Sequence, residues 1–167
     1  MMQQNDFHTV RGYQLLAQGD KQLTSAMEDY LEMIYRNIRK DGYMRINTLA
    51  EMLNVKPSSA TKMVQKLTGL ALLDYKKYGI IFLTERGKEI GEFLLNRHNI
   101  IEKFLKCIGT TDDILTETEL IEHNIGSNTL KNIDLLTRFL DIHPEVITEL
   151  EQFKRECSSA GDPSLGE

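Results

Sequence analysis

The sequence predicts a mainly α-helical protein with one small β-hairpin, divided into two domains. Apolar residues recur at helical spacing through most of the 167-residue chain. Residues 72–75 and 79–83 form the short apolar runs that are typical of paired strands, and residues 44–46 are long enough only for a small strand. The length allows one domain or two small domains that share an interface.

The first helix is expected at residues 24–40. Thr24 is a suitable N-cap, and Gly42 follows the end of the pattern. Asp29 and Glu32 lie three residues apart beside the apolar stripe, so both carboxylates point from one side of the helix. The stripe itself falls at helical intervals on Met27, Tyr30, Leu31, Ile34 and Ile38.

Two shorter helices are expected next, joined by a tight turn. Asn47 or Thr48 is the predicted cap of the first helix, and Thr48-x-x-Glu51 has the pattern of a capping box. Pro57 suits the first position of the second helix, which should continue through residues 58–67. The outer face of this second helix offers hydroxyls, an amide and cations, with little bulk to keep it out of a DNA major groove.

The hairpin that follows these helices predicts a winged helix-turn-helix domain. Its tip is basic and aromatic, and a hairpin directly after a recognition helix is the wing of such a domain, where cations meet phosphate. An ordinary hairpin with a soluble turn is the other interpretation, but order, spacing and local charge favour the wing. The candidate DNA-binding residues lie on the turn, the second helix and the hairpin tip: Lys56, Pro57, Ser58, Ser59, Thr61, Lys62, Gln65, Lys66, Lys76, Lys77 and Tyr78.

Charge is distributed unevenly along the chain. The net charge is -5, but residues 36–90 carry eleven Lys and Arg against five Asp and Glu, which leaves +6 there and -11 in the remainder. A basic N-terminal half joined to an acidic C-terminal half suits a DNA-binding module attached to a cation-binding module, although solubility alone also produces such a division.

Four helices are expected in the C-terminal part, at residues 84–108, around 119–124, at 127–142 and at 145–156. The apolar faces of the first and third are too wide to be covered within one chain. Together with the symmetry of palindromic DNA half-sites, these faces predict a homodimer.

The segment Glu119-Leu120-Ile121-Glu122-His123 places three potential metal ligands at i, i+3 and i+4, on one side of a helical turn. A solvated polar face produces the same pattern, so the segment needs ligands from elsewhere to become a site. Cys107 and Cys157 have no Cys or His partner at zinc-site spacing and are expected to be reduced thiols.

Residues 24–142 resemble the manganese-responsive transport regulators (MntR), a branch of the diphtheria-toxin-repressor (DtxR) superfamily. The similarity is strong in Met27-Glu28-Asp29-Tyr30-Leu31-Glu32, in residues 56–67, at Leu83-Thr84, at Arg97-His98 and at Glu119-x-x-Glu122-His123. The resemblance implies a metal-dependent repressor that binds double-stranded operator DNA as a homodimer and controls manganese uptake genes. It also implies one set of metal ligands: Asp29, Glu32, His98, Glu119, Glu122 and His123.

The resemblance further implies the kind of metal. Iron-responsive relatives use methionine and cysteine at the positions of Asp29 and Glu119, whereas four carboxylates and two imidazoles form an oxygen-rich set that suits Mn²⁺. The set offers enough ligands for two ions per subunit, and Fe²⁺, Co²⁺, Zn²⁺ or Cd²⁺ are possible substitutes. Asn124 stands where relatives often carry a second histidine, and the loop between His98 and Glu119 is one residue shorter.

Two other classes of function remain open on sequence alone. One is a winged-helix regulator that needs no metal, and the other is a metallohydrolase, for which we find no separate catalytic residues. No apolar run approaches the length of a membrane span and the N-terminus lacks a secretory signal, so we expect a cytoplasmic protein without a membrane partner.

The sequence predicts four segments. They are an N-terminal arm at residues 1–23, a winged helix-turn-helix domain at 24–91, a helical linker, metal-binding and dimerisation domain at 92–156, and a disordered tail at 157–167.

Overall fold

The computed structural model describes residues 23–159. The chain forms two compact units, the first ending at His98 and the second beginning at Asn99. The expected N-terminal arm lies outside the described residues except for Leu23, as does the tail beyond Ser159. The helical fold with a small sheet is confirmed.

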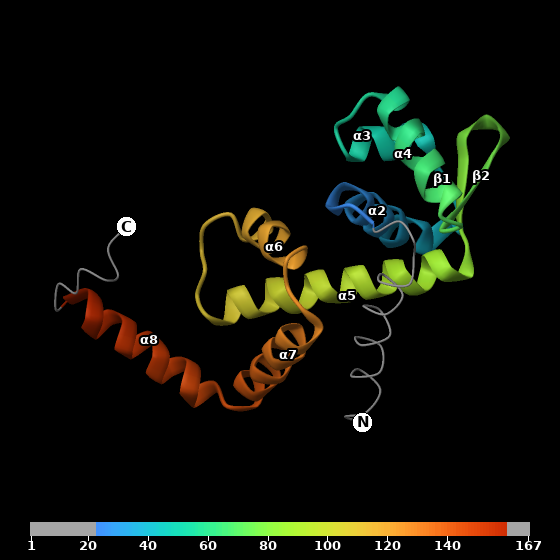
Figure 1. Ribbon diagram of the computed structural model, residues 1–167. Helices are drawn as coiled ribbons and strands as arrows, with labels where there is room; N and C mark the ends of the chain where they lie inside the picture. The colour runs from blue at the N-terminus through green and yellow to red at the C-terminus, as the bar shows by residue number, and fades with distance from the viewer. Residues whose placement is uncertain (1–22, 160–167) are drawn as a thin grey trace. The chain divides into compact units, whose positions relative to one another are not determined.

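The first unit consists of helices around a three-stranded sheet. Its elements are α2 (Ser25–Asp41), β1 (Met44–Arg45), α3 (Ile46–Met52), α4 (Pro57–Gly69), β2 (Leu73–Lys76), the 3-10 turn η1 (Lys77–Gly79), β3 (Ile80–Leu83) and the start of α5 (Glu85–Cys107). In Figure 1, α3 and α4 lie together beside the hairpin. This arrangement is the winged helix-turn-helix that the sequence predicts.

The ends of α2 form as expected. The backbone N–H of Met27 donates to the Thr24 hydroxyl at 3.4 Å. Gly42 adopts the left-handed conformation at φ 75°, and its N–H donates to the carbonyl of Ile38 at 2.8 Å. Glycine has no Cβ to oppose this conformation, so the helix ends here with its last carbonyls capped.

The predicted start of α3 is wrong. The helix begins at Ile46, with Arg45 at the N-cap position and no side-chain cap, so neither Asn47 nor Thr48 caps it. The reason lies in the sheet, because β1 pairs with β3 through Arg45, opposite Ile80. This pairing fixes the backbone up to the residue before the helix and leaves no room for a separate capping turn.

The sheet has the antiparallel order β1-β3-β2, with Leu73 opposite Leu83 and Lys76 opposite Ile80. Tyr78 and Gly79 at the tip of the hairpin both have positive φ, 65° and 74°. A Cβ on Gly79 would lie 2.6 Å from Cγ2 of Ile46, so this position requires glycine for space as well as for conformation.

Close packing joins α2 to the first part of α5. Leu31 and Ile34 of α2 are fully buried, as is Leu94 of α5. A Cβ on Gly91 would lie only 2.6 Å from Cβ of Tyr35. Glycine at this position therefore allows the two helices to approach each other.

The second unit contains the end of α5, then α6 (Ile114–Glu122), α7 (Ser127–Ile142) and α8 (Pro144–Ser159). Asp113 caps α6 with its side chain, so this helix begins five residues before the expected position and ends at Glu122. α8 continues to Ser159, three residues past the expected end. The ammonium of Lys154 donates to the carbonyl of Ile108 at 2.5 Å, which ties α8 to the end of α5.

None of the helices formed by residues 23–159 is both long enough and apolar enough to cross a membrane.

Candidate metal centre and DNA-binding surface

Almost all of the predicted DNA-binding residues are exposed to solvent on the first unit. Along α4, Ala60, Val64 and Leu67 are buried, so the opposite side of the helix faces solvent. All eleven candidate residues are exposed except Thr61, which is half-buried and donates its hydroxyl to the carbonyl of Pro57 at 2.8 Å. The domain thus presents the second helix of the helix-turn-helix and the hairpin tip to solvent, the two elements that contact DNA in winged-helix proteins.

The hairpin tip has an unusual conformation for its composition. Tyr78 is 91% exposed, so burial of its ring does not offset the conformational cost of its left-handed backbone. The ammonium of the neighbouring Lys76 lies 2.6 Å from the carboxylate of Asp74, and both side chains are about half exposed. An exposed pair of this kind is weak, so Lys76 can exchange Asp74 for a phosphate.

Three of the six predicted metal ligands belong to the first unit. Asp29 and Glu32 lie on successive turns of α2, and His98 lies on α5. Glu32 and His98 are buried, with 7% and 4% of their surfaces exposed, and their ligand atoms lie within 4.8 Å of each other. A carboxylate and an imidazole at this separation can bind one cation between them, because each ligand needs to be roughly 2 Å from the ion.

The other three ligands belong to the second unit. Glu119 and Glu122 lie on the last turns of α6, and His123 is its C-cap in helical conformation. The Nε2 atom of His123 is 4.0 Å from Oε2 of Glu119 and 3.8 Å from Oε1 of Glu122. These distances exceed hydrogen bonds but match the spacing of two ligands about 2 Å from one ion.

Burial distinguishes this cluster from a solvated polar face. Glu122 is only 1% exposed, whereas Glu119 has a side chain that is 44% exposed. An ionised carboxylate is buried at a high energetic cost unless a positive charge compensates it. The donor set of carboxylates and imidazole therefore fits a divalent cation, and the hard oxygen atoms fit Mn²⁺ chemically.

The structure reveals two arginines that the sequence-based reasoning did not include in the site. Arg36 Nη2 donates to Oε1 of Glu32, which is one helical turn away. Arg97 Nη2 donates to Oε2 of Glu28 at 2.7 Å, and this pair is largely buried. The i, i+4 spacing of Glu32 and Arg36 was visible in the sequence, but nothing local pairs Glu28 with a residue 69 positions later.

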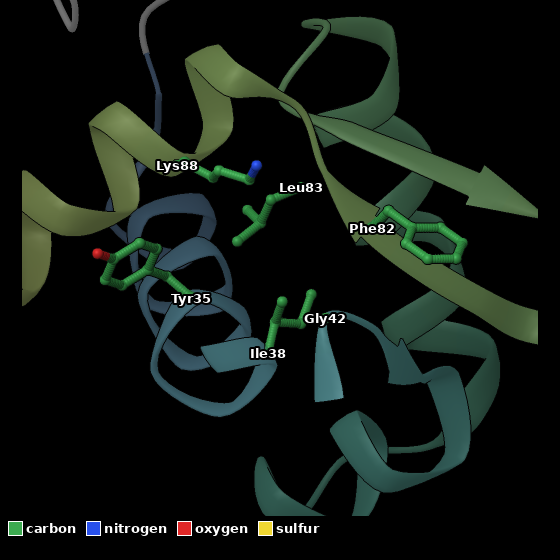
Figure 2. A pocket seen from close by; sticks show the side chains of 6 residues that line it. All are labelled: Tyr35, Ile38, Gly42, Phe82, Leu83 and Lys88. Carbon is green, nitrogen blue, oxygen red and sulfur yellow. The ribbon is translucent and has the colours of Figure 1, made fainter. Parts of the chain in front are cut away.

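A pocket in the first unit lies apart from these ligands (Figure 2). Its volume is about 360 Å³. Figure 2 shows Tyr35 and Ile38 of α2 on one side, Phe82 and Leu83 of β3 on another, and Lys88 of α5 at the edge. The lining is mostly apolar and includes none of the six predicted ligands, so this pocket is not the metal centre.

Comparison with known families assigns a description to each half of the chain. Residues 22–81 match the iron dependent repressor, N-terminal DNA binding domain. Residues 84–151 match the iron dependent repressor, metal binding and dimerisation domain. Fold and residues together define a metal-dependent DNA-binding regulator of transcription, not an enzyme.

Curated relatives narrow this class. The chain is 48% identical over 120 residues to the HTH-type transcriptional regulator MntR of Oceanobacillus iheyensis, covering 71% of this chain and 82% of the relative. It is 44% identical over 119 residues to the protein of the same name from Bacillus subtilis, covering 71% and 84%. The chain belongs to the MntR/DtxR family of transcriptional repressors, and the resemblance stated from its motifs is confirmed.

Solved structures agree with this assignment. The manganese regulator SloR matches with a TM-score of 0.59 and 30% identity, covering 69% of this chain and 53% of that one. ScaR with bound Zn²⁺ matches with a TM-score of 0.57 and 29% identity, covering 68% and 54%. The chain spans about half the length of these two structures.

Proposed function

We propose that this protein is a Mn²⁺-dependent repressor that binds operator DNA as a homodimer and controls genes of manganese uptake. The observation that carries the proposal is the cluster of Glu119, the buried Glu122 and His123, whose ligand atoms lie within 4.8 Å of one another. This oxygen-rich donor set without a thiol suits Mn²⁺, but Zn²⁺ and Co²⁺ bind comparable sites more tightly, so site geometry and metal supply in the cell must select Mn²⁺. A DNA-binding regulator of this kind acts in the cytoplasm.

The proposed ligands are divided between the two units. Asp29, Glu32 and His98 come from the first, and Glu119, Glu122 and His123 come from the second. A bound divalent cation supplies positive charge that balances the charge of these carboxylates. Without it the carboxylates repel one another and leave the units free to move, so a ligand set of this kind shifts the population toward one arrangement of the DNA-binding domains.

Metal binding and operator binding are coupled, and the coupling acts equally in both directions. Allosteric coupling of this kind is typically about 1 to 3 kcal/mol, which changes operator affinity roughly 5- to 150-fold. Linkage requires that operator DNA tighten metal binding by the same factor. Six ligands are enough for two ions per subunit, so two ions are part of the proposal, with Fe²⁺, Co²⁺, Zn²⁺ and Cd²⁺ as substitutes at the same ligands.

The second unit also carries the surface proposed for the homodimer. Its helices expose large apolar side chains that a soluble domain seldom leaves uncovered. These are Leu115, Leu120, Leu135, Leu136, Phe139, Ile142 and Phe153. A second copy of the chain is the proposed cover, because the matched C-terminal family domain is a dimerisation domain and palindromic operators require two-fold symmetry.

A titration of DNA binding tests the proposal. The purified full-length protein is added to promoter fragments of manganese transporter genes with chelator, Mn²⁺, Fe²⁺, Zn²⁺ or Ca²⁺. We expect binding with Mn²⁺ that chelator abolishes, and no binding with Ca²⁺. Equal affinity with chelator and with Mn²⁺ would instead support a winged-helix regulator that needs no metal.

A pair of variants on α6 tests the ligands. Glu122→Ala should abolish metal-dependent DNA binding and leave the dimer folded, because the change removes one buried ligand. Glu117→Ala is the matched control, since Glu117 is exposed on the same helix and should leave metal response unchanged. Loss of the dimer in Glu122→Ala, measured by light scattering, would assign Glu122 a structural role instead.

A further inference from the structure

Arg36 contacts one of the proposed ligands directly. It follows Glu32 by one turn of α2, and its guanidinium donates to Oε1 of that carboxylate. The Arg36 side chain is 42% exposed, whereas the Glu32 side chain is 9% exposed. Arginine is not deprotonated in proteins, so the Glu32 carboxylate carries a permanent cationic partner before any metal binds.

A metal ion and Arg36 need the same carboxylate. Glu32 has two oxygen atoms, so it can contact both cations at once, but their positive charges then repel each other across one small group. We propose that Arg36 is an internal counter-ion that competes with the divalent cation for Glu32. Arg36 thereby raises the metal concentration at which the ligand pair Glu32 and His98 is filled, a role that rests on the proposed function.

The structure favours competition over a positioning role. Burial of Glu32 and its place in the middle of α2 already fix the direction of its side chain. The Glu-to-Arg order at i, i+4 suits pairing on a helix, yet pairs at this spacing contribute little to helix stability. Charge is therefore the main property that Arg36 adds to the ligand.

The experiment measures the affinity of the full-length protein for Mn²⁺ by equilibrium titration at low and high salt. In Arg36→Met and Arg36→Gln we expect Mn²⁺ to bind about 3- to 10-fold more tightly. The gain should shrink at high salt, because ions screen the exposed guanidinium. Tighter binding cannot result from misfolding, so the sign of the change is informative by itself.

Arg138→Met is the matched control. Arg138 pairs with Asp134 at the same i, i+4 spacing on α7, with side chains 39% and 20% exposed, and Asp134 is not a proposed ligand. This variant should leave Mn²⁺ affinity unchanged. An equal gain in Arg138→Met would mean that net charge, not the contact with Glu32, causes the effect, and would overturn the inference.

Two further outcomes would also overturn it. Unchanged or weaker Mn²⁺ binding in Arg36→Met contradicts competition. Wild-type affinity in Arg36→Gln with weaker binding in Arg36→Met would assign Arg36 a positioning role through its hydrogen bond. Glu122→Ala, titrated in parallel, separates this inference from the proposed function: if that variant binds Mn²⁺ like the wild type, the proposed ligand set is wrong.

Discussion

The buried pair of Arg97 and Glu28 makes the strongest prediction for stability. Their side chains are 3% and 12% exposed, and the guanidinium carbon also lies 5.9 Å from the centre of the Phe93 ring. Arg97→Met removes the cation that pairs with the largely buried Glu28 carboxylate. Breaking a buried ion pair from one side costs about 3 to 5 kcal/mol, and the lost contact with the ring adds about 0.5 to 1 kcal/mol.

The assay is urea unfolding of the metal-free protein in chelator, followed by helical circular dichroism. We expect Arg97→Met to lose about 3.5 to 6 kcal/mol, and Glu28→Leu combined with Arg97→Met to recover most of it, because no buried charge is then left uncompensated. Lys103→Met is the control, since the Lys103 and Asp141 side chains are 53% and 40% exposed and such pairs contribute at most about 1 kcal/mol. Equal losses in Arg97→Met and Lys103→Met would refute the reasoning.

Three further predictions concern the first unit. Gly91→Ala should lower the free energy of unfolding by about 1 to 3 kcal/mol, because the new Cβ would lie 2.6 Å from Cβ of Tyr35; unchanged urea unfolding would show that the helices separate freely. Lys62→Ala should reduce the slope of log affinity against log salt by about 1, measured by fluorescence anisotropy with operator DNA, and an unchanged slope would mean that Lys62 contacts no phosphate. Tyr78→Gly should keep stability within about 1 kcal/mol, because glycine adopts φ 65° readily, and should weaken DNA binding; undiminished affinity would remove Tyr78 from the interface.

Local signals in the sequence predicted most of the fold. Helical periodicity identified α2, α5 and α7, and α7 begins and ends at the expected residues. The cap at Thr24 and the first-turn position of Pro57 were also predicted, because both depend on backbone groups within a few residues. Such features need no information about distant parts of the chain.

The two wrongly predicted helix starts have different causes. The expected cap of α3 was wrong because pairing between β1 and β3 starts the helix at Ile46. Asp113 was not anticipated as the cap of α6, where its side chain accepts from the N–H of Thr116 at 3.4 Å. In the first case a partner distant in the sequence decides where the helix begins. In the second case, the residue before the helix, Asp113, has a left-handed backbone with φ 33°, which the sequence pattern did not indicate.

The candidate site was also predicted only in part from the sequence. The residues Glu119, Glu122 and His123 were identified by helical spacing, and the family motif added Asp29, Glu32 and His98. The boundary proposed between residues 91 and 92, and the assignment of the six ligands, stay predictions. Spacing could not show that Glu122 is 1% exposed, which is what favours a cation over a solvated surface.

By itself the sequence determined the helices, the helix-turn-helix with its wing, and the family, because these depend on periodicity, turn residues and contiguous motifs. Only the tertiary structure decided which side chains are buried and which charges meet. Arg97 meets Glu28 across 69 positions, and β1 joins β3 across the helix-turn-helix. Such contacts depend on how helices and strands pack, and the spacing of residues within one segment carries no information about that packing.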